Sequence, residues 1–213
     1  MIDNVIEGLR ALPTASVSDA LVQLGSPGTM EADIKPVVTG RLVGPAVTVL
    51  EERADGAGAP THALEAIDTA AAGSVVVIGV ERAREVAVWG GLMTAGAAAR
   101  GLAGAVLDGA ARDVEEIERD FGMPVYARAI SPKTTVGTYR TVAHGVPVEC
   151  GGIRVSPGDF VVADRDGVVV VPAGMVEQVL AVGREIEERE RQTTERIRAL
   201  GSISKAVAEF NRI

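Results

Sequence analysis

The residues of this chain that could carry chemistry gather between Gly90 and Asp113. Two adjacent glycines, Gly90 and Gly91, open a helical pattern of small residues, and Leu92 and Met93 follow them. Backbone N–H groups at a helix start, together with the helix dipole, attract a carboxylate or a phosphate. Glycines leave such N–H groups open to close approach by a ligand. The local sequence is equally compatible with two glycines that only make a tight turn.

An Arg112-Asp113 pair closes this stretch and offers a second kind of contact. The guanidinium of Arg112 is a planar fork suited to a bidentate carboxylate. Asp113 could cap the next helix, pair with Arg112 or bind a divalent cation, and Mg2+ often takes only one or two carboxylates and completes its shell with water and substrate oxygens. The commoner arrangement for such a pair is a capping aspartate beside a surface arginine.

A βαβαβ pattern positions both groups of residues. Its strands are predicted at 74–80, 103–107 and 124–129, and its helices at 90–100 and 113–120. Right-handed crossovers make such strands parallel, and ligands bind at the carboxyl ends of the strands in open α/β sheets. The turn before Gly90 and the turn at Asp108-Gly109 therefore fall on the same edge of the sheet.

The rest of the chain predicts helices before this centre and short strands after it. A helix is expected at 2–12, a second one is capped by Ser16 with Asp19 as partner and ends at Gly25, and Thr61 caps a third that runs to about Ala72. Strands are expected at 41–51, 146–150, 153–155, 160–163 and 168–171, the last two joined by a hairpin turn at 164–167. The prediction is an α/β domain with a mixed sheet at 1–172 and a helical C-terminal extension at 173–213.

Composition excludes several classes of function. The net charge of −8 argues against a nucleic-acid partner, which needs a basic face. Cys150 is the lone cysteine, so no disulfide framework exists. The first residues lack the pattern of a signal peptide, and no apolar window reaches the ~18 residues of a membrane span. A soluble, cytoplasmic protein is therefore expected.

Other candidate groups give weaker signals. His62 and His144 have no cysteine or histidine at zinc-ligand spacing, so each is expected to be structural or solvent-facing. Lys133 could form a Schiff base if it were desolvated, although a loop lysine beside a proline is usually exposed. No GxGxxG follows a predicted strand, which leaves a methyltransferase or nucleotide-binding function without a fingerprint.

Several motifs together resemble the RraA-like family. They are SVSDAL, VVVIGV, GGLMTAGAAARGLAGAVLDGAARD, VLDGAARDVEEI, MPVYARAISP, PVECGGIRVSPGD and VVADRDGVVVVP. The family includes the class II 4-hydroxy-4-methyl-2-oxoglutarate/4-carboxy-4-hydroxy-2-oxoadipate aldolases and regulators of ribonuclease E, and many members carry an old dimethylmenaquinone methyltransferase label. The resemblance implies a single domain of the swivelling β/β/α type.

The resemblance also implies a site for a pyruvyl group. The backbone amides of Gly90 to Met93 would bind substrate oxygens, Arg112 would bind the pyruvyl carboxylate or carbonyl oxygen, and Asp113 would hold Mg2+, Mn2+ or another divalent cation. A glutamate from the C-terminal helix of a neighbouring subunit would complete the site; Glu190 is the best match by position, with Glu187 and Glu188 as alternatives. That arrangement implies a homotrimer, or a hexamer made of two.

One position departs from the aldolase pattern. The aldolases carry an acidic residue that orients metal-bound water where this chain has Gly91. The expected activity is a metal-dependent lyase that forms pyruvate by retro-aldol cleavage, by oxaloacetate decarboxylation or by both, with aldol cleavage the more impaired because it needs a base. Two alternatives remain: a non-catalytic regulatory protein of the ribonuclease-regulator type, and a Schiff-base aldolase that uses Lys133.

Overall fold

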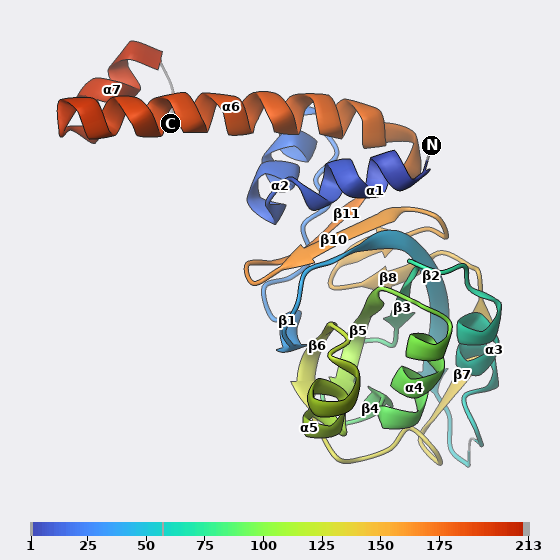
Figure 1. The fold of residues 1–213 in the computed structure, drawn as a ribbon. Helices are drawn as coiled ribbons and strands as arrows, with labels where there is room; N and C mark the ends of the chain where they lie inside the picture. The colour runs from blue at the N-terminus through green and yellow to red at the C-terminus, as the bar shows by residue number, and fades with distance from the viewer. Residues whose placement is uncertain (1, 57, 211–213) are drawn as a thin grey trace.

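The computed structural model describes residues 2–56 and 58–210 and has a mixed α/β fold (Figure 1). Nine strands form one sheet in the order β1-β6-β5-β3-β2-β10-β11, in which β4 also pairs with β5 and β7 with β2. The strands are β1 (Lys35–Val38), β2 (Leu42–Arg53), β3 (Val75–Gly79), β4 (Ala87–Trp89), β5 (Gly104–Ala111), β6 (Val125–Ile130), β7 (Tyr139–His144), β10 (Phe160–Asp164) and β11 (Gly167–Val171), with β8 (Val148–Cys150) and β9 (Ile153–Val155) as a separate hairpin. The predicted fold class is confirmed.

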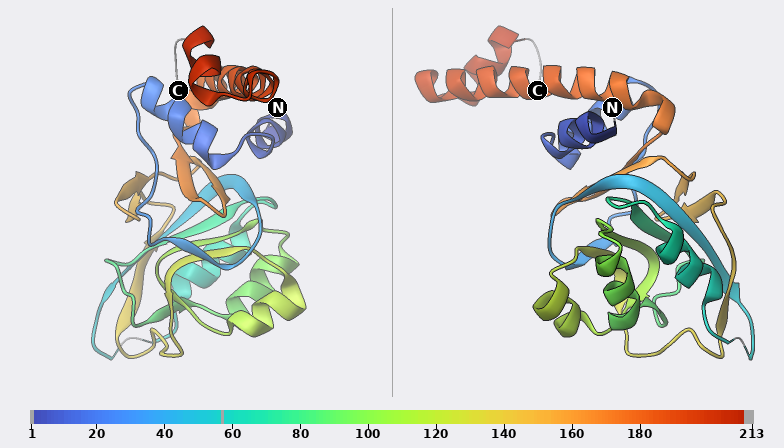
Figure 2. Two further views of the ribbon diagram at one scale, coloured as in Figure 1. Left: turned by 90° about the vertical axis from the view of Figure 1, so that its left-hand side faces the viewer. Right: turned by 45° about the vertical axis from the view of Figure 1, so that its right-hand side comes forward.

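Helices cover the sheet in two groups (Figures 1 and 2). They are α1 (Ile2–Arg10), α2 (Thr14–Gln23), α3 (Thr61–Thr69), α4 (Gly91–Ala99), α5 (Val114–Glu116) with the π-helix η1 (Ile117–Phe121), the 3-10 turn η2 (Ala173–Met175), α6 (Val176–Leu200) and α7 (Ile203–Phe210). The group α3, α4 and α5 packs on one face of the central strands, whereas α1 and α2 lie between the β10–β11 hairpin and α6.

The core is built from small and β-branched side chains. The strand β3 is buried along its whole length, and its valines pack against alanines of α3 and α4 on one face. On the other face, residues of the β8–β9 hairpin and the chain around Met30 and Ile34 close a second apolar cluster. Strands that are covered on both faces carry such continuous apolar runs, which is why SVVVIGV was readable as a buried strand.

The predicted βαβαβ centre is confirmed. Strand β3 pairs in parallel with β5, and β5 pairs in parallel with β6. The β2 strand also runs parallel to β3, from Ala46 opposite Val75 to Leu50 opposite Gly79. The carboxyl ends of these strands therefore share one edge of the sheet, as the sequence predicted.

The predicted turn at Asp108-Gly109 is wrong, because β5 continues through both residues to Ala111. The pairing of β5 with β6 shifts register between Leu107 and Ala110, so the Asp-Gly pair forms a bulge inside the strand. The reason is tertiary: Asp108, only 4% exposed, accepts hydrogen bonds from Arg128 Nε (2.8 Å) and Nη2 (2.6 Å) on β6. A paired carboxylate can stay in the strand, whereas an unpaired one would need water.

The same ion pair joins three further segments. Asp108 also accepts hydrogen bonds from the backbone N–H of Gly151 (2.8 Å) and of Arg82 (3.0 Å). Arg128 forms ion pairs with Glu31 and Asp33 as well. Burial alone would lower the pKa of Arg128, but its hydrogen bonds with Glu31 and Asp108 raise it above its usual range. The guanidinium is therefore charged, and its carboxylate partners hold it in place.

Several smaller predictions also fail at element ends. Strands β1, β4 and β7 were not predicted, because each is short or polar and gains its order from pairing with β6, β5 and β2, respectively. Ser16 does not cap α2: it lies inside the helix and bonds Glu187, whereas the N–H of Thr14 is bound by the distant Asp164 (3.0 Å). Thr61 is the first residue of α3 rather than its cap, and that helix ends at Thr69.

The C-terminal helix α6 is 25 residues long and extends beyond the rest of the molecule (Figure 1). Its first part, from Val176 to Ile186, packs against α1, α2 and the β10–β11 hairpin. Its second part contacts α7. The division into segments 1–172 and 173–213 remains a prediction, and its ends at Met1 and residues 211–213 lie outside the described residues. None of the described helices is long and apolar enough to cross a membrane.

Glu51 is a buried carboxyl group without a described partner. It lies on β2 opposite Thr141 of β7, is 1% exposed, and neither of its carboxylate oxygens has a hydrogen-bond partner among the described residues. Burial raises the pKa of Glu51 to about 7, because the charged form loses its hydration. The neutral form is therefore the one that the fold accommodates.

We predict that Glu51 makes stability fall as pH rises. The pKa of Glu51 is near 4.5 in the unfolded chain and about 7 in the folded one. At pH 4 the carboxyl group is neutral in both states and does not change the free energy of unfolding. Between pH 4.5 and pH 7 it ionises in the unfolded chain first, so the free energy of unfolding decreases. The decrease is on the order of 3 kcal/mol above pH 7. Urea unfolding of the wild type and of Glu51→Gln at pH 5 and pH 8 measures it: the variant should gain stability relative to wild type at pH 8. An unchanged difference between the two pH values would contradict this account.

Candidate functional site

The start of α4 is fixed by a buried tryptophan. Trp89, the last residue of β4, donates a hydrogen bond from Nε1 to Thr94 Oγ1 (2.8 Å), and Thr94 Oγ1 in turn donates to the carbonyl of Gly90 (3.0 Å). Trp89 and Thr94 are both buried. The first turn of α4 is therefore held to the sheet by side chains rather than by a capping residue, since Gly90 at the N-cap has none to offer.

Asp113 joins the two helix starts that the sequence placed on one edge. Its Oδ2 accepts a hydrogen bond from the backbone N–H of Gly91 (3.0 Å) and lies 3.5 Å from Nε of Arg112. The backbone N–H of Arg112 is bonded to the carbonyl of Trp89 (3.0 Å), which keeps the ends of β4 and β5 together. The sequence left three roles open for Asp113. The prediction that its side chain caps the following helix, α5, is wrong, because the carboxylate makes no hydrogen bond to the first turn of that helix.

The conformation of Asp113 is unusual. Its φ is +57°, in the left-handed region that non-glycine residues seldom adopt, although aspartate does so more readily than most. Such strained backbone is often found at functional sites. Here it turns the carboxylate back toward Gly91 and away from the helix that follows.

The glycines at 90 and 91 leave space that carboxylate side chains of neighbouring residues occupy. A Cβ at Gly90 would lie 2.7 Å from Asp113 Oδ2 and 3.1 Å from Cγ of Arg112. No described residue accepts a hydrogen bond from the backbone N–H groups of Leu92 or Met93. These two N–H groups remain available to a ligand, and the side chain of Leu92 beside them is 90% exposed.

Glu116 is a residue that the sequence analysis missed. A Cβ at Gly91 would lie only 2.8 Å from Glu116 Oε1 and 3.1 Å from Oε2, so this carboxylate fills the space beside Gly91. Glu116 lies on α5, three positions after Asp113. The available signal was this acidic residue close to the Arg112-Asp113 pair. A carboxylate thus lies beside position 91, where the aldolase pattern has an acidic residue.

The donors at this edge suit a hard divalent cation. Asp113 and Glu116 place two carboxylates beside the Gly90-Gly91 pair, and Mg2+ commonly binds through one or two carboxylates plus water and substrate oxygens. Among the described residues no group of three or more His, Cys, Asp or Glu side chains could enclose a metal by itself. The protein part of such a site therefore leaves coordination positions open to a substrate.

Helix α6, which carries the three candidate glutamates, lies at the opposite end of the molecule from α5, the helix that begins after Asp113 (Figure 1). Glu187 bonds Ser16, and Glu188 pairs with Arg191 and Gln192, hydrogen bonds that lower the pKa of Glu188 to about 2. Glu190 is exposed and lines a pocket of about 400 Å3 between α2, α6 and α7. Within one chain, Glu190 does not come close to Arg112 and Asp113. Of the three glutamates, Glu190 is the one that makes no hydrogen bond or ion pair with a described side chain.

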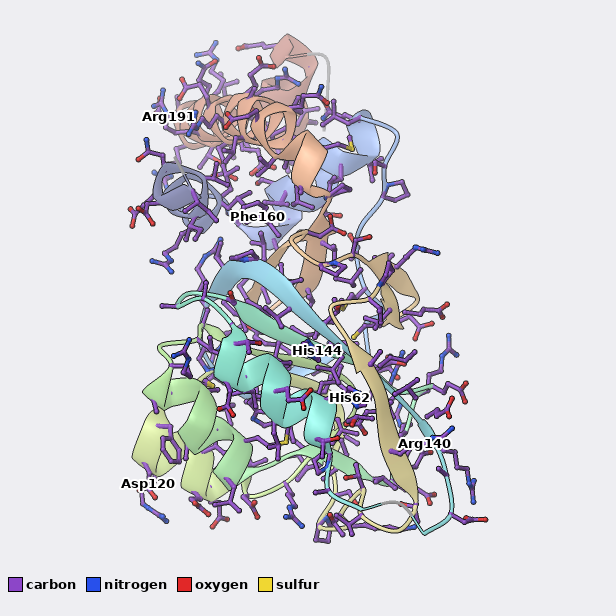
Figure 3. The ribbon with its side chains drawn as sticks, turned by 90° about the vertical axis from the view of Figure 1, so that its right-hand side faces the viewer. His62, Asp120, Arg140, His144, Phe160 and Arg191 are labelled. Atoms are coloured by element: carbon purple, nitrogen blue, oxygen red, sulfur yellow. The ribbon has the colours of Figure 1, made fainter. Side chains whose placement is uncertain are left out.

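The remaining candidates have surroundings that give no support for a second site. His62 on α3 bonds Thr141, and its ring lies 6.3 Å from that of His144 on β7, which is near Glu65 (Figure 3). Lys133 is exposed in a loop, so the desolvation that a Schiff-base lysine requires is missing. Cys150 is buried, and burial raises the pKa of its thiol well above the usual value.

Known proteins resemble this chain along most of its length. The model of a family described as RraA-like (Aldolase/RraA) matches residues 14–170. A protein of Halalkalibacterium halodurans, named "Putative 4-hydroxy-4-methyl-2-oxoglutarate aldolase", is 34% identical over 206 residues, which cover 92% of each chain. A 4-hydroxy-4-methyl-2-oxoglutarate aldolase of Thermus thermophilus is 34% identical over 101 residues, 47% of this chain and 60% of that protein.

Solved structures share the fold. An uncharacterized protein from Pseudomonas syringae superimposes with a TM-score of 0.88 at 32% identity, covering 98% of this chain and 95% of the other. Streptomyces coelicolor RraAS2, described as an unusual member of the RNase ES inhibitor RraA protein family, superimposes with a TM-score of 0.82 at 27% identity over 91% of this chain and 98% of its own. The same scaffold thus carries names of two kinds, aldolase and ribonuclease inhibitor.

Proposed function

Because the chain belongs to the RraA-like family, we propose that it is a divalent-metal-dependent carbon–carbon lyase that releases pyruvate from 2-oxo acids. The substrates proposed are of the 4-hydroxy-4-methyl-2-oxoglutarate type, and oxaloacetate for decarboxylation. The observation that carries the proposal is the meeting of Arg112, Asp113 and Glu116 at the Gly90-Gly91 pair. Relatives named as aldolases support the lyase class.

Each group at this edge has a binding role in the proposal. The free N–H groups of Leu92 and Met93 donate to oxygens of the pyruvyl group, favoured by the dipole of α4. The guanidinium of Arg112, 41% exposed, binds the pyruvyl carboxylate. Asp113 supplies the carboxylate that would hold Mg2+, Mn2+ or a similar cation, and Glu116 lies close by, beside Gly91. When bound, such a cation polarises the C2 carbonyl and stabilises the enolate of pyruvate.

Retro-aldol cleavage requires one proton transfer in each direction. Glu116 takes the proton of the C4 hydroxyl, directly or through a water molecule, and the C3–C4 bond breaks as C4 becomes a carbonyl. The bonding electrons pass to C3 and the C2 oxygen, and protonation of C3 then gives pyruvate. For 4-hydroxy-4-methyl-2-oxoglutarate the other fragment is a second pyruvate. Oxaloacetate instead loses its C4 carboxylate as CO2 and needs no base for a hydroxyl group.

The proposal includes a homo-oligomer, a trimer or a hexamer made of two. Glu190 of one subunit would reach the site of the next, since it is exposed and α6, which carries it, lies at the opposite end of its own chain from α5. The exposed side chain of Leu92 beside the site would be covered by the same neighbour. A contact between two different surfaces closes into a ring when the rotation allows it.

The central prediction concerns pyruvate release. The wild type should release pyruvate from 4-hydroxy-4-methyl-2-oxoglutarate or oxaloacetate with Mg2+ and stop when EDTA is added. Arg112→Ala and Asp113→Ala should each lower kcat/KM on the order of a hundredfold or more, because each removes a charge that stabilises the transition state. Coupled lactate dehydrogenase reports pyruvate, and size-exclusion chromatography checks that assembly is kept.

Arg140→Ala is the matched control, since Arg140 pairs with Glu52 on β2 and lies away from the Asp120 end of the molecule (Figure 3). It should keep full activity. Wild-type protein without metal-dependent pyruvate release from either substrate would overturn the proposal, and a stable protein partner captured under those conditions would support a regulatory role on the same scaffold. Near-full activity of either site variant would mean that the site is misplaced.

A second prediction separates the two reactions through Glu116. Glu116→Gln should lower kcat for aldol cleavage about a hundredfold, because the base for the hydroxyl proton is lost, and should change oxaloacetate decarboxylation much less. Glu118→Gln, an exposed neighbour on the same helical segment, is the control. Equal losses in both reactions would show that Glu116 serves metal binding and does not transfer the proton.

A third prediction tests the contribution of the neighbouring subunit. Glu190→Gln and Asp113→Ala homo-oligomers should each be nearly inactive, whereas co-expressed chains should regain up to about a quarter of wild-type activity. That fraction is expected because random mixing puts an intact Asp113 against an intact Glu190 in one of four interfaces. Glu185→Gln, exposed on the same helix, replaces Glu190→Gln in the control mixture. Failure of the mixed oligomer to regain activity would place Glu190 outside the site.

A further inference from the structure

A pocket of about 620 Å3 opens beside Asp113 and extends along the helical segment that follows it. Its lining residues are Asp113, Val114, Glu115, Glu116, Arg119 and Ile130. Asp113 and Glu116 belong to the proposed site, so a substrate bound there has part of its length in this pocket. Ile130, 62% exposed at the end of β6, gives the pocket an apolar wall.

The charges of the pocket restrict where an anionic group can lie. Three of its lining residues are acidic, and Arg119 is the basic one. A carboxylate of the ligand is repelled along most of this surface and attracted at Arg119. Arg112 is not a lining residue of this pocket and lies against Gly90 and Asp113. The proposed site therefore has one guanidinium beside Gly90 and a second one in the adjoining pocket.

Arg119 is placed by an irregular helical turn. Residues Ile117–Phe121 form a π-helix, closed by a hydrogen bond from the N–H of Gly122 to the carbonyl of Ile117 (2.9 Å). Ile117 is fully buried and anchors this turn to the core. Such wide turns are rare and are frequently found at functional sites. In this chain the turn carries an arginine that lines the pocket.

We propose that Arg119 binds the second carboxylate of a dicarboxylic 2-oxo acid whose pyruvyl end is bound at Arg112, Asp113 and the start of α4. The inference rests on the proposed function and names the residue that selects a dicarboxylate over a monocarboxylate. Arg119 contacts the distal end of the ligand and takes no part in the proton transfer.

The present partner of Arg119 does not prevent this role. Its Nε and Nη2 each donate to the carboxylate of Asp120 at 2.7 Å, and both side chains are exposed. An exposed pair between adjacent residues contributes little to stability. A carboxylate of the ligand can therefore replace Asp120 at a small cost in free energy. The remaining N–H groups of the guanidinium can also donate hydrogen bonds to the ligand.

Two ligands that cannot be cleaved by the retro-aldol reaction test the assignment. 2-Oxoglutarate has the carbon chain of the proposed substrate with both carboxylates, and 2-oxopentanoate has the same length with only the first. Calorimetry with Mg2+ should give wild-type protein about tenfold higher affinity for 2-oxoglutarate, as expected for an exposed charge-assisted contact. Arg119→Gln should remove that preference and change 2-oxopentanoate affinity less than about twofold.

Two further variants sharpen the test. Asp120→Asn should raise the affinity for 2-oxoglutarate, because it frees the guanidinium from its competitor. Arg191→Gln is the control: Arg191 is also exposed and paired with a nearby glutamate, but lies on α6 at the opposite end of the molecule from Asp120 (Figure 3). It should leave both affinities unchanged. With 4-hydroxy-4-methyl-2-oxoglutarate, Arg119→Gln should raise KM and keep kcat, as for a uniform binding contact.

The outcomes separate this inference from the proposed function. Equal wild-type affinity for the two ligands, or an Arg119→Gln variant that weakens both equally, overturns the role of Arg119 even when the wild type releases pyruvate. A lowered kcat with unchanged KM overturns it as well. Absence of Mg2+-dependent binding of either ligand overturns the pyruvyl site itself, and the inference with it.

Discussion

The buried ion pair between Asp108 and Arg128 is the interaction on which the functional edge of the sheet depends. It joins β5 to β6 and extends through backbone contacts to Arg82 and Gly151. Removing one partner of such a pair leaves an unpaired buried charge, which costs about 3–5 kcal/mol. The pair also neutralises a carboxylate inside β5, which continues past Asp108 to Ala111. These last residues of β5 pair with β4, and Arg112 and Asp113 follow them directly.

The site depends on the close approach of the backbone at Gly90 and Gly91 to its neighbours as much as on its charged side chains. A Cβ at Gly90 or Gly91 would displace the carboxylate of Asp113 or of Glu116 from its present position. The buried Trp89–Thr94 hydrogen bond fixes one side of this contact, and the left-handed conformation of Asp113 fixes the other. Charged groups held by rigid elements need little rearrangement when a ligand binds, which is the basis of electrostatic preorganisation. The strain at Asp113 is thus compensated by contacts that the fold supplies.

The single chain leaves this edge open. The N–H groups of Leu92 and Met93 have no described acceptor, the side chain of Leu92 is exposed, and the pocket beside Asp113 is lined mainly by acidic groups. At the other end of the molecule, Glu190 lies in a pocket between helices that project beyond the body. Both features are consistent with a protein whose working form contains more than one copy, as proposed above, and they explain why a single chain shows only part of a site.

The sequence by itself determined the parallel centre and the shared edge of Gly90 and Arg112-Asp113, because continuous apolar runs and small-residue helices report burial locally. It also predicted the β8–β9 and β10–β11 hairpins from their turn residues. It failed at Asp108-Gly109, at β4 and β7, and at Ser16, where the outcome depends on partners distant in the chain. Glu116 escaped notice for the same reason: its carboxylate matters only because tertiary packing brings it against Gly91. Periodicity and turn chemistry act over a few residues, whereas neutralising a charge or filling the space beside a glycine requires the whole fold.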